Sequence, residues 1–121
     1  MAEVALVTFQ ATLAPAFAAL NYEWIEHYFE VEDEDRAALE DPVGYAIEPG
    51  GEIFFVLEDG EPVGTVAMVP KGSACFELAK MAVRPTCQGR GYSTLLMDAC
   101  ITFARQKSAT EVMLVTNDIL A

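Results

Sequence analysis

The sequence has 121 residues, 53% of them hydrophobic, and a formal net charge of -12 at pH 7 from 19 acidic and 7 basic side chains. The length suits one domain with one core, and the hydrophobic fraction excludes a disordered chain. The acidic excess argues against a nucleic-acid partner, because nucleic-acid-binding proteins neutralise phosphates with Lys and Arg. We therefore expect a single folded domain over residues 1–121.

The first predicted elements are a strand over Val4–Phe9, which is apolar and rich in β-branched residues, and a helix over about Pro15–Phe29. Tyr22, Glu23 and Glu26 lie off the apolar face of this helix, where we expect them to contact either a substrate or water. The apolar face itself has residues at spacings of three and four: Phe17, Leu20, Trp24 and Tyr28.

The segment Val4–Tyr22 is uncharged, so a signal peptide or a membrane span has to be weighed. Glu3 precedes this segment, where a signal peptide would carry positive charge. Several polar residues and Pro15 disfavour a span. We expect a soluble, cytoplasmic protein with no membrane partner.

An acidic segment, Glu32–Glu40, permits a helix that ends at Asp41-Pro42, because the residue before a proline avoids the α region. Residues 42–52 are rich in Gly and Pro and are predicted to form a loop. Asp59-Gly60 and residues 70–73 are turn signals between three consecutive strands, which indicates an antiparallel meander. The three predicted strands are Ile53–Leu57, Val63–Val69 and Cys75–Val83.

After the meander, the pattern predicts a helix that ends near Lys107 and a fifth strand over Glu111–Thr116. The expected fold class is α/β (α+β), with a mixed, mostly antiparallel sheet flanked by helices.

Charge is unevenly distributed along the chain. Fourteen acidic residues lie between Glu23 and Glu61, where Arg36 is the single basic residue, whereas five of the seven basic residues lie between positions 80 and 107. A solvated acidic face that keeps the protein soluble explains the first half. The alternative is an anion site in the second half beside a surface that attracts cations.

The three cysteines, Cys75, Cys87 and Cys100, have no CxxC spacing, and His27 is the single histidine. This pattern lacks the ligands of a zinc site and predicts reduced thiols in a cytosolic protein without a metal. A Cys–His pair or a Ser–His–Asp triad would have to use His27, and no nucleophile-elbow sequence is present.

The clearest chemical signal lies between the strand that ends at Val83 and the next helix. Gly89 and Gly91 leave the backbone open to a ligand, and the first N–H groups of a helix have no partner within it. Because the dipole is positive at that end, the pattern is typical of a phosphate cradle, to which Arg84 and Arg90 would add mobile positive charge. The alternative is a tight turn that needs glycines for its dihedral angles.

Two other phosphate-binding motifs fit poorly. A P-loop needs Lys followed by Ser or Thr, and no such pair follows Gly91. A dinucleotide fingerprint needs a third glycine where Thr94 stands, and it follows the first strand of a βαβ unit.

The run Gln88-Gly89-Arg90-Gly91-Tyr92-Ser93 resembles the Q/R-x-x-G-x-G/A signature of the GNAT acetyltransferases. The flanks, Met81–Pro85 before it and Leu95-Leu96 after it, are also similar to that family. Ser93 is the one departure within the signature, and it is small enough for binding to survive. The resemblance covers essentially the whole chain in its order of elements.

This resemblance implies that acetyl-CoA is the co-substrate and that its acetyl group passes to a primary amine by direct attack. Its pantetheine arm would lie between the strand ending at Val83 and the strand Glu111–Thr116, pairing with backbone near Met81 and Val83. Asn117 is similar to a residue that often contacts the cofactor. The diphosphate would be held by backbone amides of Gln88, Gly89, Arg90, Gly91, Tyr92 and Ser93.

The resemblance also implies a proton acceptor for the amine. Glu77 is similar in position to the carboxylate that many GNAT enzymes use, although a charged residue on a half-exposed strand is more often only solvated. Tyr22, Glu23 and Glu26 are weaker candidates for contact with the acceptor. An acidic first half fits a cationic acceptor such as an amine, a polyamine or a lysine side chain.

A complete GNAT domain continues with another helix and two more strands, which carry a tyrosine that often protonates the leaving thiolate. The sequence ends at Ala121, and its four tyrosines do not match that position. We expect the apolar edge of Glu111–Thr116 to be covered either by missing chain or by a second copy in a homodimer. As written, the chain should bind acetyl-CoA better than it catalyses.

Two further functions stay open from the sequence. The first is a module that binds or senses an acyl-CoA without turnover. The second is an interaction domain in which the glycines serve only the turn.

Overall fold

A five-stranded sheet forms the centre of the computed structural model, which describes residues 3–28, 33–72 and 74–114. The strands lie in the order β1-β2-β3-β4-β5. Neighbours from β1 to β4 pair antiparallel, and β5 pairs parallel to β4, which confirms the predicted meander and mixed sheet. The strand bounds are Val4–Thr8, Glu52–Glu58, Glu61–Pro70, Cys75–Val83 and Glu111–Leu114.

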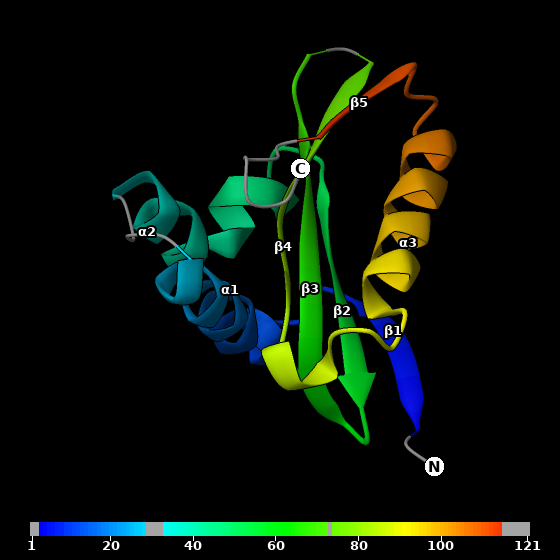
Figure 1. Ribbon diagram of the computed structural model, residues 1–121. Coiled ribbons are helices and arrows are strands. Elements are labelled where there is room, and N and C mark those ends of the chain that lie inside the picture. Colours follow the sequence, from blue (N-terminus) through cyan, green and yellow to red (C-terminus); the bar gives the residue numbers. More distant parts are fainter. Residues whose placement is uncertain (1–2, 29–32, 73, 115–121) are drawn as a thin grey trace.

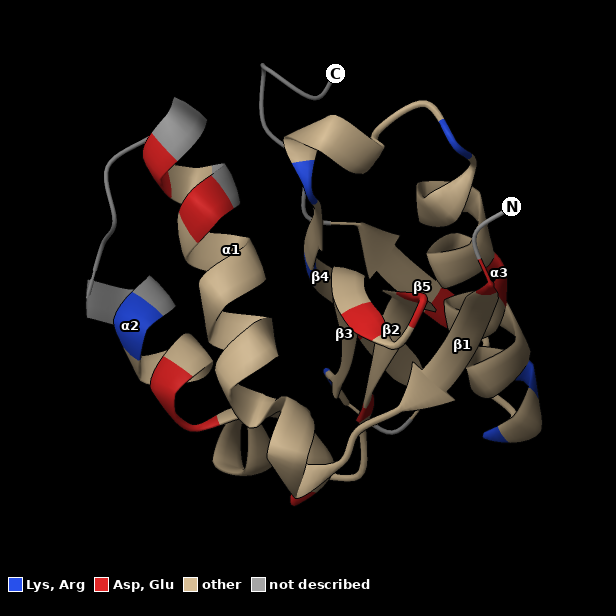
Figure 2. Ribbon diagram, turned by 90° about the horizontal axis from the view of Figure 1, so that it is seen from below, with Lys and Arg blue, Asp and Glu red and all other residues tan. Residues whose placement is uncertain are grey.

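Helices cover both faces of the sheet (Figures 1 and 2). Helices α1, Ala14–Tyr28, and α2, Asp33–Glu40, lie on one side, and α1 contacts β3 and β4. Helix α3, Tyr92–Gln106, lies on the other side against β2, β3 and β4 and connects β4 to β5. Short helical turns precede α1 at Ala11–Leu13 and α3 at Pro85–Cys87.

The core on the α3 side is built around Phe103. Its ring meets Phe54 of β2 and Phe76 of β4 nearly edge-on, with ring centroids 6.1 and 5.2 Å away. Leu96 and Cys100 of the same helix are fully buried beside these rings. Burial raises the pKa of the Cys100 thiol to about 12, so this cysteine packs as a neutral thiol.

The core on the α1 and α2 side confirms part of the predicted apolar helix face. Phe17 and Leu20 are buried, whereas the side chains of Trp24 and Tyr28 lie outside the described residues. Asn21 is also buried, and its amide donates to the Phe17 carbonyl at 3.0 Å, which satisfies a polar group inside the core. The other large members of this core include Leu39, Ile53 and Phe55.

The segment predicted as a loop, residues 42–52, contains a π-helical turn over Val43–Ile47 and the first residue of β2. The Asp41 side chain accepts from the Gly44 N–H at 3.1 Å, and Ala46 is fully buried. The segment was predicted as a loop from its Gly and Pro content. The burial of Ala46 and the hydrogen bond between Asp41 and Gly44 instead stabilise a helical turn there.

A bulge interrupts β4 just before its end. Thr65 pairs with Ala82 and Ala67 with Ala79, so two residues of β4 stand opposite one residue of β3. Lys80, within the bulge, has a φ of 56°, which is unusual for a residue other than glycine. Bulges of this kind bend a strand and redirect its backbone groups.

Candidate cofactor-binding and active site

The predicted phosphate cradle is a short turn between β4 and α3. Gly89 and Gly91 have φ values of 84° and 82°, a left-handed conformation that favours glycine. A Cβ atom added to either residue would meet nothing within 4 Å. The turn therefore needs its glycines for their dihedral angles, and the space in front of them is also open.

The backbone N–H groups of this turn are available to a ligand. Gly91 is the N-cap of α3, and no side chain caps the helix there. Within the described part of the chain, the N–H groups from Gly89 to Thr94 have no hydrogen-bond acceptor, and the first helical bond runs from the Leu95 N–H to the Gly91 carbonyl at 3.2 Å. Unpaired donors at the positive end of a 15-residue helix suit an anion.

The two arginines near the turn do not lie as predicted. Arg90 was predicted as a free positive charge beside the cradle, but its guanidinium forms an ion pair with Glu58 of β2 at 2.7 Å. The Tyr92 hydroxyl donates to the same Glu58 oxygen, while the tyrosine ring is buried. The two hydrogen bonds, Tyr92 first and Arg90 second, hold the pKa of Glu58 below its ordinary value, and both partners' pKa values are raised.

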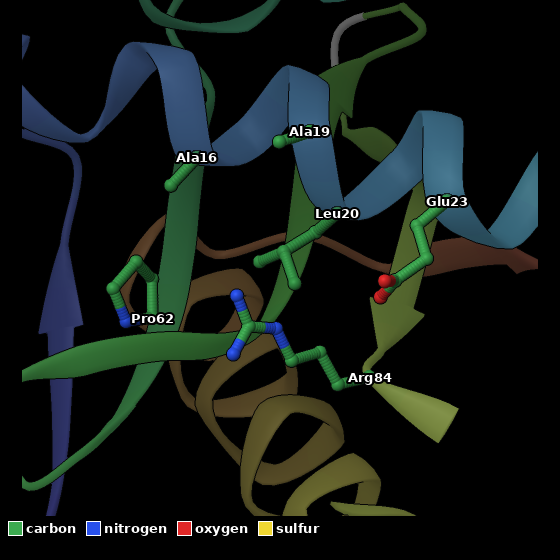
Figure 3. A pocket seen from close by; sticks show the side chains of 6 residues that line it. All are labelled: Ala16, Ala19, Leu20, Glu23, Pro62 and Arg84. Atoms are coloured by element: carbon green, nitrogen blue, oxygen red, sulfur yellow. The ribbon is translucent and has the colours of Figure 1, made fainter. Parts of the chain in front are cut away.

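Arg84 points to the α1 side of the sheet (Figure 3). It lines a pocket of about 100 Å³ with Glu23 of α1 and Pro62 of β3, below the apolar side chains of Ala16, Ala19 and Leu20. Within the part of the chain that the structure describes, no carboxylate lies within ion-pairing distance of Arg84. The pocket is thus lined by Glu23, a predicted contact of the acceptor amine, and by Arg84, which the sequence had predicted to lie beside the phosphate.

The other two weak candidates for the acceptor do not line this pocket. Glu26 is exposed on the same helix, and Tyr22 is half-buried and packs against the core on the α1 side. Of the three, Glu23 is the one that lines this pocket.

Glu77 lies on β4 before the bulge. Its neighbours Phe76 and Leu78 belong to the core on the α3 side, so the alternation of a strand directs Glu77 to the α1 and α2 side. Its side chain is 19% exposed, and one carboxylate oxygen lies 3.9 Å from Nζ of Lys71. The carboxylate is half-buried and only loosely paired.

Met81 and Val83, also predicted as cofactor contacts, direct their side chains into the core on the α3 side. They can therefore meet a ligand only through their backbone. Met81 belongs to the bulge and has no Cα partner on β3, which leaves its backbone outside the ladder. The Gln88 side-chain amide donates to the Val83 carbonyl at 3.4 Å and connects the turn to the end of the strand.

A comparison of the sequence with known protein families agrees with this geometry. The model of the acetyltransferase (GNAT) family matches residues 17–120. The chain belongs to the GNAT acetyltransferase family.

Solved GNAT-type structures share the fold at low sequence identity. An acetyltransferase of the GNAT family from Staphylococcus aureus has a TM-score of 0.89 and 15% identity, over 98% of this chain and 76% of that one. An acetyltransferase from Clostridium acetobutylicum, solved with acetyl-CoA, has a TM-score of 0.78 and 14% identity, over 97% of this chain and 83% of that one. N-acetylglutamate synthase from Neisseria gonorrhoeae, solved with coenzyme A and N-acetyl-glutamate, has a TM-score of 0.74 and 22% identity, over 98% of this chain and 26% of that chain. No curated protein matches the sequence.

In this GNAT domain, the sheet edge formed by β5, which pairs parallel to β4, is apolar, as predicted. Met113 and Leu114 of β5 are 44% and 56% exposed. The remainder of the predicted strand Glu111–Thr116, and Asn117 with it, lies outside the described residues. Coverage of this edge by a second copy stays a prediction, as does a cytoplasmic location.

Among residues 3–28, 33–72 and 74–114, no group of three or more His, Cys, Asp or Glu side chains is placed to hold a metal ion. No helix in these ranges is both long and apolar enough to cross a membrane.

Sequence reasoning missed Glu58 as a partner of the Gly89–Ser93 turn. Glu58 lies 32 positions before Arg90 in the chain, and a glutamate at the end of a predicted strand is ordinarily solvated. The one signal was its place next to the Asp59-Gly60 hairpin turn, which says nothing about α3. Pairing through the sheet brings the two segments together.

Proposed function

We propose that this chain is an acetyl-CoA-dependent N-acetyltransferase, in which a primary amine attacks the thioester directly. The observation that carries the proposal is the turn at Gly89–Ser93, whose backbone donors lack acceptors among the described residues and whose glycines leave the approach open. A diphosphate matches such a turn, because its several charged oxygens can accept from several N–H groups at once.

Within this proposal, the amides from Gly89 to Ser93 hold the diphosphate, and the backbone near Met81 and Val83 orients the pantetheine arm. The Gln88 N–H, also predicted to contact the diphosphate, donates to the Pro85 carbonyl at 3.4 Å. When bound, acetyl-CoA supplies the acetyl group as a thioester that a neutral amine attacks. Glu77 stands six residues before Val83, about 20 Å along an extended strand. A long, narrow donor such as coenzyme A is suited to join the diphosphate turn to the carboxylate.

Glu77 is proposed to accept the proton that the acceptor ammonium has to lose, directly or through one water. Its half-buried position and the distance of 3.9 Å to Lys71 leave carboxylate lone pairs for such a contact. A backbone N–H of the β4 bulge would donate to the carbonyl oxygen as negative charge develops on it. Positioning of the two reactants supplies much of the remaining rate.

The acceptor is proposed to approach from the side of α1, where Glu23 reaches a pocket and Figure 2 shows further acidic segments on α1 and α2. A cationic amine would be attracted to this face before it loses its proton. Tyr22 and Glu26 stay candidates for contact with a larger acceptor.

The proposal is tested in two steps with the whole chain. Calorimetry with coenzyme A, acetyl-CoA and ATP comes first, and we expect binding of the first two without binding of ATP. No binding of any of the three would leave only a folded domain without a ligand. Thiol release with a panel of primary amines comes second. Binding without release from any amine would favour a module that senses acyl-CoA.

A further inference from the structure

One carboxylate holds both residues that flank Gly91. A single oxygen of Glu58 accepts from Arg90 on one side of the glycine, at 2.7 Å, and from the Tyr92 hydroxyl on the other. The signature does not account for these three side chains, because binding through amides requires only the backbone N–H groups of residues 90 and 92. The pairing connects β2 directly to the cofactor turn.

The anchor of this connection is rigid. Glu58 lies in a strand with partners on both sides, because its Cα is paired with Val4 of β1 and with Glu61 of β3. Its side chain is only 19% exposed, compared with 49% for that of Arg90. The sheet therefore holds the backbone that carries the carboxylate, and the carboxylate in turn bonds both residues that flank Gly91.

Two other side chains help to order the turn, namely Gln88 through the Val83 carbonyl and Tyr92 through its buried ring, but neither acts at Gly91 itself. Gly91 has no side chain, its Cβ position is in open space, and no side-chain cap closes the first turn of α3. Glycine loses more conformational freedom on ordering than any other residue. If no contact ordered the turn beforehand, this loss of conformational entropy would oppose cofactor binding, and the affinity for the cofactor would be lower.

The ion pair also sets the charge at the turn. Arg90 is engaged by Glu58, and Glu58 is neutralised by Arg90. A Glu58 carboxylate without its arginine would stand uncompensated beside the site where a diphosphate binds, and like charges repel.

We propose that Glu58 is a positioning residue for the cofactor: it orders the turn around Gly91 before binding, through Arg90 and Tyr92, and Arg90 acts by neutralising Glu58 rather than by contacting the diphosphate. The inference rests on the proposed function. It adds a residue from β2 and a role for Arg90 that differs from that of a phosphate ligand.

The test measures the Kd of coenzyme A by calorimetry for the wild-type chain and five variants: Glu58→Gln, Tyr92→Phe, Arg90→Gln, the Glu58→Gln/Arg90→Gln double variant, and the control Glu61→Gln. We expect Kd to rise about tenfold in Glu58→Gln, which removes the charge that strengthens both hydrogen bonds, and about threefold in Tyr92→Phe, which removes one of the two donors. Arg90→Gln should weaken binding more than the double variant does, because only the single variant leaves an uncompensated carboxylate. Glu61→Gln, on the same hairpin, should leave Kd unchanged.

A second readout separates positioning from a general loss of stability. Backbone ¹⁵N order parameters of residues 89–93 in the ligand-free protein should fall in Glu58→Gln, whereas those at the Gly72 turn should not. An unchanged Kd in Glu58→Gln, unchanged order at the turn, or equal losses in Arg90→Gln and the double variant would overturn the inference. If the wild-type chain itself fails to bind coenzyme A, the proposed function fails, which is a different result.

Discussion

The two sides of the sheet contribute to the candidate site in different ways. On the α3 side, the proposed cofactor turn is a contiguous run from Gln88 to Ser93 whose shape follows from two glycines and a helix start. On the α1 side, Glu23 comes from α1, whereas Glu77 and Arg84 come from β4 and the residue that follows it, more than 50 positions later in the chain. In the proposed function, the first side binds the cofactor by backbone donors, and the second offers side-chain charges.

This difference predicts which substitutions act on which step. A change in the turn should alter cofactor affinity and leave any chemistry at Glu77 in place. A change on the α1 side should alter turnover or acceptor use while cofactor affinity stays constant. Four experiments, from the largest expected effect to the smallest, test this separation.

Gly91→Val should have the largest effect, a loss of coenzyme A affinity of about 100-fold or more measured by calorimetry. The side chain would occupy the open space in front of the amides, and a non-glycine residue at a φ of 82° is strained by about 1–2 kcal/mol. Gly72→Val is the matched control, because Gly72 also has a positive φ of 109° and open surroundings, at the turn between β3 and β4. Equal losses of affinity in both variants would contradict the proposed site.

Glu77→Gln should reduce the turnover of acetyl-CoA with an amine about 100-fold, because the amide cannot accept the proton. The Kd of acetyl-CoA should change by less than about twofold. Glu111→Gln serves as the control, since Glu111 is exposed and pairs with Cys75 on the neighbouring strand. A wild-type rate in Glu77→Gln would remove this residue from the mechanism.

Glu23→Gln should raise the KM of a cationic acceptor by about three- to tenfold at low salt, and the difference should shrink as salt is added. Glu40→Gln, an exposed glutamate at the end of α2, should have no such effect. If the two variants behave alike, the acidic surface acts as a whole and the Glu23 pocket has no special part.

The smallest expected effect is the pH dependence of the Glu58–Tyr92 contact. The pKa of Glu58 is lowered from 4.5 and that of Tyr92 is raised from 10.0, in each case chiefly by their mutual hydrogen bond. The stabilisation is therefore present between these values, is lost as pH falls through the lowered pKa of Glu58, and is lost as pH rises through the raised pKa of Tyr92.

Tyrosine absorbance near 295 nm checks the basic limb of this prediction. One tyrosine of the wild-type chain should ionise above its ordinary range, and Glu58→Gln should return it toward that range. The difference in unfolding free energy between the two proteins should be constant near neutral pH and decrease at both extremes. A Tyr92 that titrates normally in the wild-type chain would show that the contact is absent in solution.

Most of the fold could be predicted because its signals are local. Apolar runs bounded by turn signals indicated the strands, Asp59-Gly60 indicated the first hairpin, and the glycine pair indicated the start of α3. The π-helical turn at Val43–Ile47 was missed because Gly and Pro content has no period, and its order comes from the buried Ala46. The bulge at Lys80 was missed as well, since nothing in a lysine predicts a positive φ.

The sequence by itself determined the family signature, the order of elements and the cofactor turn, because each depends on residues within a few positions of one another. The tertiary structure alone decided where the charges meet. Strand pairing brought Glu58 to Arg90 and Tyr92, and the packing of α1 on the sheet placed Glu23 beside Arg84. Such contacts depend on register and on the layering of helices, which no single stretch of sequence encodes.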